Sequence, residues 1–496
     1  MSQFLRVTML LGSVTMINLL VQIVRTKVVA LSVGQAGMAV LAQMADWQGL
    51  LAAYVLLGTE QGLVALSAEA WAQGNRPAID RLLRLIRTKV APPVVLGLVA
   101  LAAASPWLMP EVTGHPGTVV AGAVGTLAML LQLWVRPRQS ILNGAKAFGL
   151  VARSRIIESV TATAMVLPLV LAFGLSGALW SLAVVQVSAF VATAWVWRSF
   201  ALPPPQSELV AAGADADSED WKTIRRFAGG LLISTGMASL LGLILRKRVI
   251  VLLGLDQAGM YQVAYALTMQ YLGIVLGAMS AYSFPTYRVA AQQPGQLAIE
   301  VNQTFRSVLL LVTPVIVGVL TLRDFLIWAL FSRDYLGSAD LLQIQLVGDL
   351  FKVVAWAMGL TILAAGRIRL HVLLELILGL TWLASVEVAS RWFGRIGPSV
   401  GFLVNQVLMC IVYAAVNYRV FGLTVWRANL GLLAASGALV IGVAVLPHGN
   451  VVWRIAAAVG GVSLWAAVSV RKAEYHSARN WLLGRIQTVL SRLRAR

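Results

Sequence analysis

Apolar stretches of about 20 residues recur along the whole chain, and they limit its fold more than any other feature. A helix of about that length crosses a hydrocarbon core about 30 Å thick. Of the 496 residues, 59% are hydrophobic and only 12% are charged, which is too little charge for the surface of a water-soluble protein. A transmembrane β-barrel would show shorter, alternating segments. We therefore expect an all-α, polytopic membrane protein.

The apolar stretches predict about fourteen transmembrane helices. We expect these helices near residues 8–33, 39–66, 86–108, 118–136, 150–172, 177–197, 227–253, 260–284, 307–322, 341–363, 370–390, 399–418, 429–446 and 451–470.

The predicted helices group into five regions of the chain. The first six helices form an N-terminal lobe, residues 1–200, and the next six form a C-terminal lobe, residues 226–420. Residues 201–225, rich in proline and acidic side chains, form a cytoplasmic linker between the lobes. Residues 421–470 add two further helices. Residues 471–496 form a basic tail, for which a helix on the anionic inner leaflet and an ordinary solvated tail both remain open.

The two halves of the sequence match at an offset of about 221 residues. The segment VRTKVVALSVGQAGM at 24–38 corresponds to LRKRVIVLLGLDQAGM at 245–260, and Phe173 and Gly174 correspond to Phe393 and Gly394. An even number of predicted spans separates the copies, so both copies have the same orientation. Parallel repeats of this kind are related by an axis along the membrane normal, with the substrate site between them. We therefore predict two parallel six-helix lobes related by a pseudo-two-fold axis, with two extra C-terminal helices.

The chain carries a formal charge of +19, from 39 Lys and Arg against 20 Asp and Glu. Such an excess can indicate a nucleic-acid-binding protein. Here most of the basic residues fall in alternate loops, which the positive-inside rule assigns to the cytoplasm. The charge therefore predicts a membrane protein with both termini in the cytoplasm, and it predicts no nucleic-acid partner.

We select five of the basic residues within predicted spans, where each charge costs about 2.5–3.5 kcal/mol on insertion scales. They are Arg25 and Lys27 in the first span, and Arg246, Lys247 and Arg248 in the seventh. Such residues mark functional sites unless they snorkel to the interface or pair with a buried carboxylate for structure.

Helical spacing places Arg25 at the end of a polar stripe. Thr15, Asn18, Gln22 and Arg25 follow one another at intervals of three and four residues, so they share one face of a helix. A polar face is costly in lipid, so we expect it to face the space between the lobes. Guanidinium groups suit phosphate, which predicts binding of a phosphate or pyrophosphate. The candidate substrate-binding residues are Arg25, Arg246, Lys27, Lys247, Arg248, Gln22 and Asn18.

Acidic residues within spans are candidates for coupling transport to a proton or sodium ion. Asp46, Glu158 and Asp349 are the three that we select. Asp349 is also spaced three residues from Lys352, which would suit a structural ion pair. The sequence predicts no other cofactor and no metal site, because the four histidines are scattered and the chain has a single cysteine.

Sequence motifs of enzymes are missing. The chain has no Walker A sequence, no nucleophile elbow and no HExxH motif. The predicted outer loops are too short to build the outer domain that membrane glycosyltransferases use. We predict no catalytic residues and a secondary transporter rather than an enzyme.

Several segments resemble Wzx-type polysaccharide flippases of the MOP (multidrug/oligosaccharidyl-lipid/polysaccharide) superfamily. They are VRTKVVALSVGQAGMAVL at the end of the first span, RKRVIVLLGLDQAGMYQVAYALT in the seventh and eighth, NGAKAFGLVARSRIIESV before the fifth, and FGLSGALWSLAVVQ before the sixth. Within this family the chain is most similar to the translocases of O-antigen and of enterobacterial common antigen lipid III.

The resemblance implies a substrate of undecaprenyl pyrophosphate bearing an oligosaccharide of lipopolysaccharide or polysaccharide biosynthesis. Two rocking lobes would move it from the cytoplasmic to the periplasmic leaflet of a bacterial inner (cytoplasmic) membrane, which is the location that the resemblance implies. Arg25 fits the family's cavity arginine that contacts the pyrophosphate, with Arg246 as its counterpart in the other lobe. The implied partners are membrane lipid, a polysaccharide polymerase and chain-length proteins.

Other functions stay open at this point. A multidrug or metabolite exporter of the same superfamily shares the expected fold, although a cationic drug would favour acidic rather than basic residues. A lipid II-type peptidoglycan precursor flippase also carries two helices beyond twelve. The short predicted outer loops argue against a membrane enzyme acting on lipid-linked sugars. A scaffold in a glycan-assembly complex would leave the buried basic residues unexplained.

Overall fold

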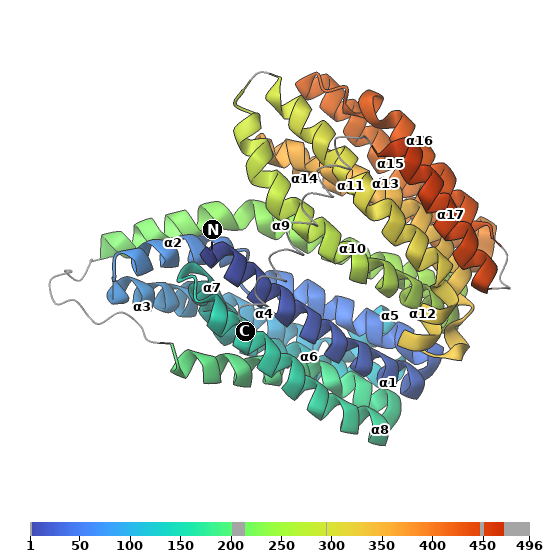
Figure 1. Ribbon diagram of the computed structural model, residues 1–496. Helices are drawn as coiled ribbons and strands as arrows, with labels where there is room; N and C mark the ends of the chain where they lie inside the picture. Colours follow the sequence, from blue (N-terminus) through green and yellow to red (C-terminus); the bar gives the residue numbers. More distant parts are fainter. Residues whose placement is uncertain (1, 201–213, 294, 447–450, 471–496) are drawn as a thin grey trace, which may run out of the picture. The chain divides into compact units, whose positions relative to one another are not determined.

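The computed structural model describes residues 2–200, 214–293, 295–446 and 451–470, and all regular secondary structure in these ranges is helical (Figure 1). Within them, nine helical segments are long and apolar enough to cross a membrane, and Asn429–Ala444 is a shorter apolar helix. The predicted tail, 471–496, and most of the predicted linker lie outside the described residues. The prediction of an all-α protein is confirmed.

Helix α8 is long enough to contain two predicted spans, and helix α1 contains one predicted span and part of the next. Helix α1 runs from Ser2 to Tyr54 and helix α8 from Phe148 to Arg198. Each is broken once, at Gly34 (φ 66°) and at Gly174 (φ 55°). A side chain in this left-handed region would clash with its own backbone, so glycine is strongly favoured at both breaks. Adjacent spans are therefore joined by a sharp bend rather than by a loop.

The chain folds into two compact units, each of which makes most of its contacts within itself. The first comprises residues 1–266, 324–341 and 368–402, and α1, α8 and α9 are its longest helices. Trp47 lies in its core, where the indole Nε1 donates to Thr126 Oγ1 at 3.0 Å. Besides α1 and α8, its elements are α2 (Glu60–Ala72), α3 (Arg76–Leu85), η1 (Ile86–Val90), α4 (Ala91–Ala103), α5 (Ser105–Thr113), η2 (Pro116–Thr118), α6 (Val119–Ala128), η3 (Met129–Leu131), α7 (Gln132–Gly144), α9 (Ala214–Leu253), α12 (Arg323–Leu330), η4 (Arg333–Tyr335), α14 (Ile368–Phe393) and η5 (Gly394–Ile396).

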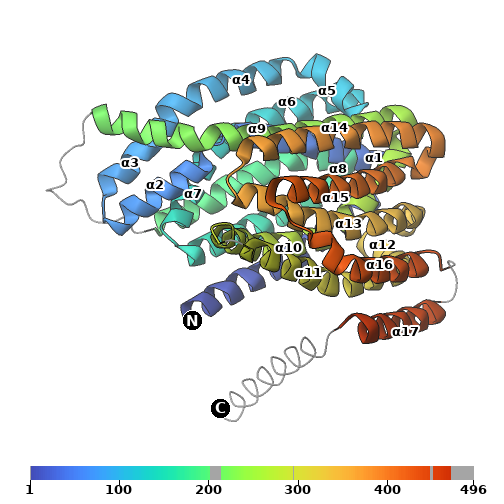
Figure 2. The same ribbon diagram turned by 90° about the horizontal axis from the view of Figure 1, so that it is seen from above.

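The second unit comprises residues 267–323, 342–367 and 403–496. Within it α11 packs against α16 and α17. Helices α16 and α17 also lie side by side in Figures 1 and 2. The buried side chains of Arg323 and Arg454 both donate to Leu320 O, at 3.3 Å and 2.8 Å, and so satisfy a carbonyl near the end of α11. Its elements are α10 (Leu255–Ala290), α11 (Gln296–Thr321), α13 (Ser338–Ala364), α15 (Gly397–Phe421), α16 (Val425–Ala444) and α17 (Val451–Ser469), of which α10, α13 and α15 also contribute residues to the first unit.

The backbone repeats with nearly the same offset as the sequence. Left-handed residues occur in corresponding pairs 220 or 221 positions apart: Gly34 and Gly254, Gly74 and Gly295, Lys146 and Gly366, and Gly174 and Gly394. These residues mark helix breaks and turns, so the order of helices and bends in the first copy recurs in the second. This agreement between backbone and sequence supports an internal duplication more strongly than the sequence matches do by themselves.

Two helix boundaries differ from those expected. The predicted span at 39–66 is interrupted, because α1 ends at Tyr54 and α2 begins at Glu60. Leu57 (φ 50°) and Gly58 (φ 74°) are left-handed between them and stop the helix. Helix α9 begins at Ala214, so the last part of the predicted linker is helical, and Asp220 there pairs with Arg81 of α3 at 2.8 Å.

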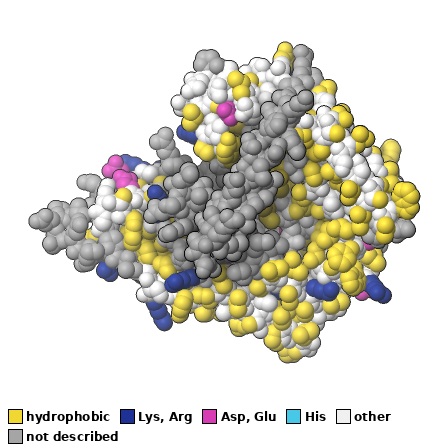
Figure 3. All heavy atoms as spheres, in the orientation of Figure 1, with side chains coloured by type: hydrophobic (Ala, Val, Ile, Leu, Met, Phe, Trp, Pro, Cys, Tyr) yellow, Lys and Arg dark blue, Asp and Glu magenta, His cyan; other side chains and the backbone are white. Residues whose placement is uncertain are grey.

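Large apolar side chains are exposed over the described surface (Figure 3). Trp392 is 81% exposed, Trp107 75% and Leu96 73%. Such a surface would be unfavourable in water and is expected where helices face lipid. Together with the long apolar helices, it identifies a multi-pass membrane protein.

Candidate functional site

The predicted polar stripe lies on α1, before the break at Gly34. Asn18 and Arg25 are half-buried and Gln22 is exposed, whereas the side chain of Thr15 lies outside the described residues. The Asn18 Oδ1 atom is buried and has no hydrogen-bond partner within the described ranges. Polar atoms left in this state are rare in folded proteins and suggest a missing partner such as a ligand or water.

Arg25 has an acidic neighbour but no close partner. It is half-buried and interacts electrostatically with Glu158 of α8. Among the described side chains, neither residue makes a hydrogen bond or an ion pair shorter than 4.0 Å through its charged group. The guanidinium of Arg25 therefore keeps its donors available for an anion.

Arg246 is buried and forms an ion pair with Asp46, in which Nε and Oδ2 are 2.9 Å apart. The pair joins α9 to α1. Its guanidinium also lies 5.9 Å from the ring of Tyr265. The structure thus brings together one residue that we predicted to bind substrate and one that we predicted to couple an ion. An internal ion pair of this kind offsets the cost of burying either charge alone.

The other basic candidates also have partners in the first unit. Lys247 Nζ donates to Glu111 Oε2 at 2.7 Å, and Arg248 donates to both carboxylate oxygens of Glu387 at 2.9 Å and 2.8 Å. Lys27 lies over the ring of Trp328, 5.4 Å from its centroid. Of the five basic residues selected from the sequence, Arg25 is the one without a close partner within the described ranges.

A polar cavity of about 510 Å³ lies within the first unit, between α1, α2, α7 and α8. We call it the polar cavity. Glu158 is part of its wall. Arg136 Nη1 donates to Glu60 Oε1 at 2.5 Å across it. Gln132 donates to Gln186 at 2.6 Å, which in turn donates to Gln48 at 3.2 Å.

Charge within the polar cavity is balanced. The wall carries two carboxylates, Glu60 and Glu158, and two guanidinium groups, Arg136 and Arg155. Sequence reasoning selected only Glu158 from this set. The signal that could have found more is the spacing of Gln132, Arg136, Gln139 and Asn143, which places them on one face of α7 as in the stripe on α1.

Asp349 lies in the second unit, fully buried in α13. Tyr271 donates its hydroxyl to Asp349 Oδ2 at 2.6 Å, and Lys352 interacts electrostatically with the same carboxylate. This arrangement is consistent with a structural role for Asp349 and Lys352, which was one of the two roles that their spacing in the sequence suggested. No cluster of three or more metal-ligating side chains occurs among the described residues.

Comparison with known proteins places the chain in a family. Residues 93–340, which are half of the chain, match the family described as polysaccharide biosynthesis protein. The lipid III flippases of Escherichia coli (strain K12) and Shigella flexneri are each 28% identical over 172 residues, covering 35% of this chain and 40% of each relative. The match therefore spans less than half the length of these curated relatives.

Solved structures with the same fold are transporters. The lipid II flippase MurJ, in an inward closed conformation, matches 94% of this chain and 98% of its own with a TM-score of 0.68 and 11% identity. An inward-facing multidrug resistance MATE family transporter of the MOP superfamily matches 86% of this chain and 98% of its own with a TM-score of 0.67 and 14% identity. At such low identity these matches show the fold alone.

The long apolar helices, the repeated helix breaks and these matches agree with one another, and the named relatives are flippases and transporters rather than catalysts. The chain belongs to the polysaccharide biosynthesis protein family.

Proposed function

We propose that this protein is a flippase for an oligosaccharide linked to undecaprenyl pyrophosphate. It moves this lipid from the cytoplasmic to the periplasmic leaflet of a bacterial inner membrane by alternating access of two six-helix lobes. The family match, the lipid III flippase relatives and the fold support this class of substrate. The observation that carries the proposal is Arg25, a half-buried guanidinium on α1 without a close partner in the described part of the chain.

The pyrophosphate binds Arg25 because a charge-assisted hydrogen bond to a phosphate oxygen is strong where water is scarce. Asn18 and Gln22 lie on the same stripe and provide neutral donors for further phosphate or sugar oxygens. Arg246 is the second cationic contact. Its ion pair with Asp46 opens when the substrate phosphate replaces the carboxylate.

The decisive experiment measures flipping of an undecaprenyl-pyrophosphate sugar with a fluorescent head group in proteoliposomes. Loss of a hydrogen bond to a charged group costs about 1.5–3 kcal/mol, so Arg25→Ala should reduce the rate about 10- to 100-fold. Arg76→Ala, which removes an exposed arginine of α3, is the matched control and should flip at the wild-type rate. Equal rates for Arg25→Ala and the control would exclude Arg25 as the phosphate ligand.

The same assay tests the alternative substrate. The MurJ match extends over 94% of this chain, more than the 86% of the MATE match, which favours a lipid II-type precursor as the second candidate. Preferential flipping of lipid II would establish that alternative. A wild-type protein that flips neither lipid, with or without an ion gradient, would contradict a flippase for either and favour an exporter or a scaffold.

Glu158 is the proposed coupling acid. It lines the polar cavity and interacts electrostatically with Arg25 and Arg155, whereas Asp46 and Asp349 already have close partners. If Glu158 carries the coupling ion, Glu158→Gln should flip substrate at a rate that no longer responds to a proton or sodium gradient. Asp349→Asn is the comparison variant and should keep that response. A full gradient response in Glu158→Gln would exclude Glu158 from coupling.

A further inference from the structure

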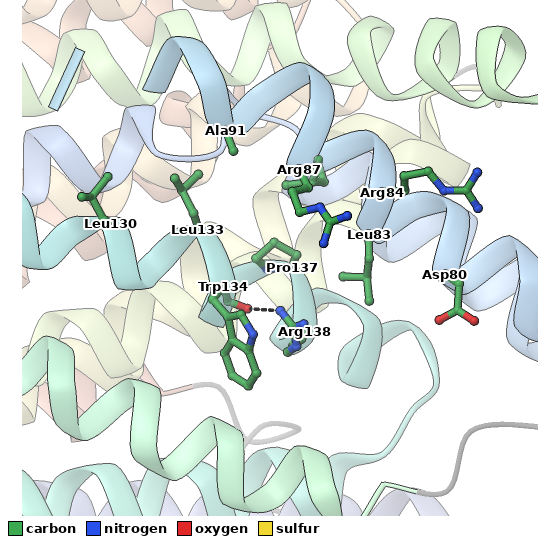
Figure 4. A pocket seen from close by; sticks show the side chains of 11 residues that line it. Asp80, Leu83, Arg84, Arg87, Ala91, Leu130, Leu133, Trp134, Pro137 and Arg138 are labelled. Carbon is green, nitrogen blue, oxygen red and sulfur yellow. Dashed lines mark hydrogen bonds between the residues drawn. The ribbon is translucent and has the colours of Figure 1, made fainter. Parts of the chain in front are cut away.

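A second cavity, of about 580 Å³, opens between α3, η1, α4 and α7 in the first unit (Figure 4). We call it the arginine cavity. Arg84, Arg87 and Arg138 contribute its basic groups, and Leu130, Leu133 and Trp134 contribute to its apolar wall. It combines cationic and apolar surfaces, and none of the residues proposed above to bind substrate lines it.

Helix α7 separates this cavity from the polar cavity. Trp134 and Arg138 are four residues apart and share one face of α7, which lines the arginine cavity. Arg136 lies between them in sequence and points to the other face, where it lines the polar cavity. The two cavities are therefore distinct sites on opposite faces of one helix.

Two guanidinium groups converge on the arginine cavity. In Figure 4 the side chain of Arg87 reaches from η1 toward Pro137 and Arg138 of α7. Arg138 is held in place, because its Nη1 donates to Trp134 O at 2.9 Å and its guanidinium lies 3.7 Å from the centre of the Trp134 ring. Its Nε atom is buried and has no hydrogen-bond partner within the described ranges. The Arg138 Nε–H group is therefore a donor that is held in position without an acceptor among the described residues, and the side chain of Arg87 reaches toward it.

No carboxylate neutralises this cluster in the part of the chain that the structure describes. Asp80 is the one acid in the wall. Its carboxylate forms an ion pair with Arg76, 3.8 Å away, and half of the Asp80 side chain is exposed. By contrast, Arg81 on the same helix pairs with Asp220 at 2.8 Å. Like charges that converge on one cavity repel one another unless an anion lies between them.

The backbone is irregular where Arg87 lies. Residues Ile86–Val90 form a π-helical turn between α3 and α4. Such turns are rare and occur frequently at functional sites. This turn places a cation-bearing segment directly before α4, whose outer face is apolar.

The apolar surface beside the cavity suits hydrocarbon chains. On α4, Leu96 is 73% exposed, Val99 46% and Val95 39%, and in a membrane protein such residues face lipid. Ala91 of α4 lines the cavity, and Val95 and Val99 follow it at intervals of four residues, so this apolar face of α4 continues from the cavity wall. A soluble phosphate would use only the cationic part of this site.

We propose that the arginine cavity binds the phosphate of an anionic membrane phospholipid, with Arg87 and Arg138 as its ligands and the acyl chains along α4. Arg84 adds a third positive charge at the rim. The lipid is a resident ligand of the transporter and not its cargo. The inference depends on the membrane location of the chain but not on the proposed flippase activity.

The test is native mass spectrometry of the full-length protein titrated with phosphatidylglycerol, phosphatidylcholine or inorganic phosphate. We expect wild type to bind phosphatidylglycerol selectively. Each lost charged hydrogen bond weakens binding by about tenfold or more, so Arg87→Gln/Arg138→Gln should lose that preference. Lys146→Gln/Arg153→Gln removes two exposed charges elsewhere in the first unit and should keep it.

Three results would overturn the proposal. Equal loss of binding in the control pair would show a general charge effect. Equal binding of phosphatidylcholine would show that the phosphate charge is not recognised. Inorganic phosphate that binds as tightly as the lipid would assign the site to a soluble anion. If the double variant fails to fold, the single variant Arg87→Gln is titrated with the same ligands and its lipid preference tests the proposal. Arg87 is exposed and packs less than Arg138, so this variant should fold.

Discussion

The two faces of α7 line cavities of similar size and opposite design. The polar cavity has equal numbers of carboxylates and guanidinium groups, and a chain of glutamine hydrogen bonds crosses it. The arginine cavity has three arginines, an apolar wall and a single acid that is paired elsewhere. Arg136 and Arg138 differ by two positions in sequence, yet one is neutralised by Glu60 at 2.5 Å and the other stacks on Trp134.

This difference distinguishes two arrangements of charge around cavities in the first unit. A cavity whose charges balance internally needs no ligand, so it can empty and refill during a transport cycle at low cost. A cavity whose cations are left without a counter-charge is completed by an anion, and it is expected to stay occupied. The proposed roles follow from this contrast: ion coupling at Glu158 in the polar cavity, and a resident lipid at Arg138.

The largest effect on this contrast should come from Glu60→Ala, which leaves Arg136 without its carboxylate. The pair is intermediate in exposure, at 30% and 38% of the two side chains, so it lies between a surface and a buried ion pair. Its loss should destabilise the protein by about 1–3 kcal/mol. Thermal unfolding in detergent should show a lower midpoint, and added anions should partly restore it because the polar cavity now resembles the arginine cavity.

Two variants sharpen that result. Glu60→Ala/Arg136→Ala should recover part of the lost stability, because both charges are removed together. Glu69→Ala removes an exposed carboxylate from the same helix and should leave the midpoint unchanged. Wild-type stability in Glu60→Ala would mean that water already solvates Arg136, and the distinction between the two cavities would then weaken.

Much of the fold was accessible from the sequence for a physical reason. A helix must be apolar over its whole length to cross lipid, so hydropathy locates it without tertiary information. The break between α1 and α2 was missed because apolar residues resume after Thr59, Glu60 and Gln61, so the segment as a whole stays hydrophobic enough to be taken as one span. The break at Gly174, in contrast, was visible because its segment recurs at Gly394.

The candidate site was less accessible, because charge pairs depend on residues far apart in the chain. Asp46 and Arg246, or Arg248 and Glu387, meet only when α9 packs against α1 and α14. No local spacing predicts such a pair. Local spacing did place Arg25 on a polar stripe, and it would also have identified Arg138, four residues after Trp134 on the same helical face.

The smallest expected effect concerns the one acid of the arginine cavity. Asp80→Asn removes a negative charge from the wall, so the arginines should attract a lipid phosphate slightly more strongly. An exposed charge contributes about 0.2–1 kcal/mol, which corresponds to an increase in phosphatidylglycerol affinity of about 1.4- to fivefold. The increase should shrink at high salt, because exposed charges are screened. Glu69→Gln is the matched control on α2 and should leave the lipid affinity unchanged. Weaker binding in Asp80→Asn would instead assign Asp80 a role in holding an arginine in position, and the arginine cavity would then resemble the polar cavity in depending on an internal carboxylate.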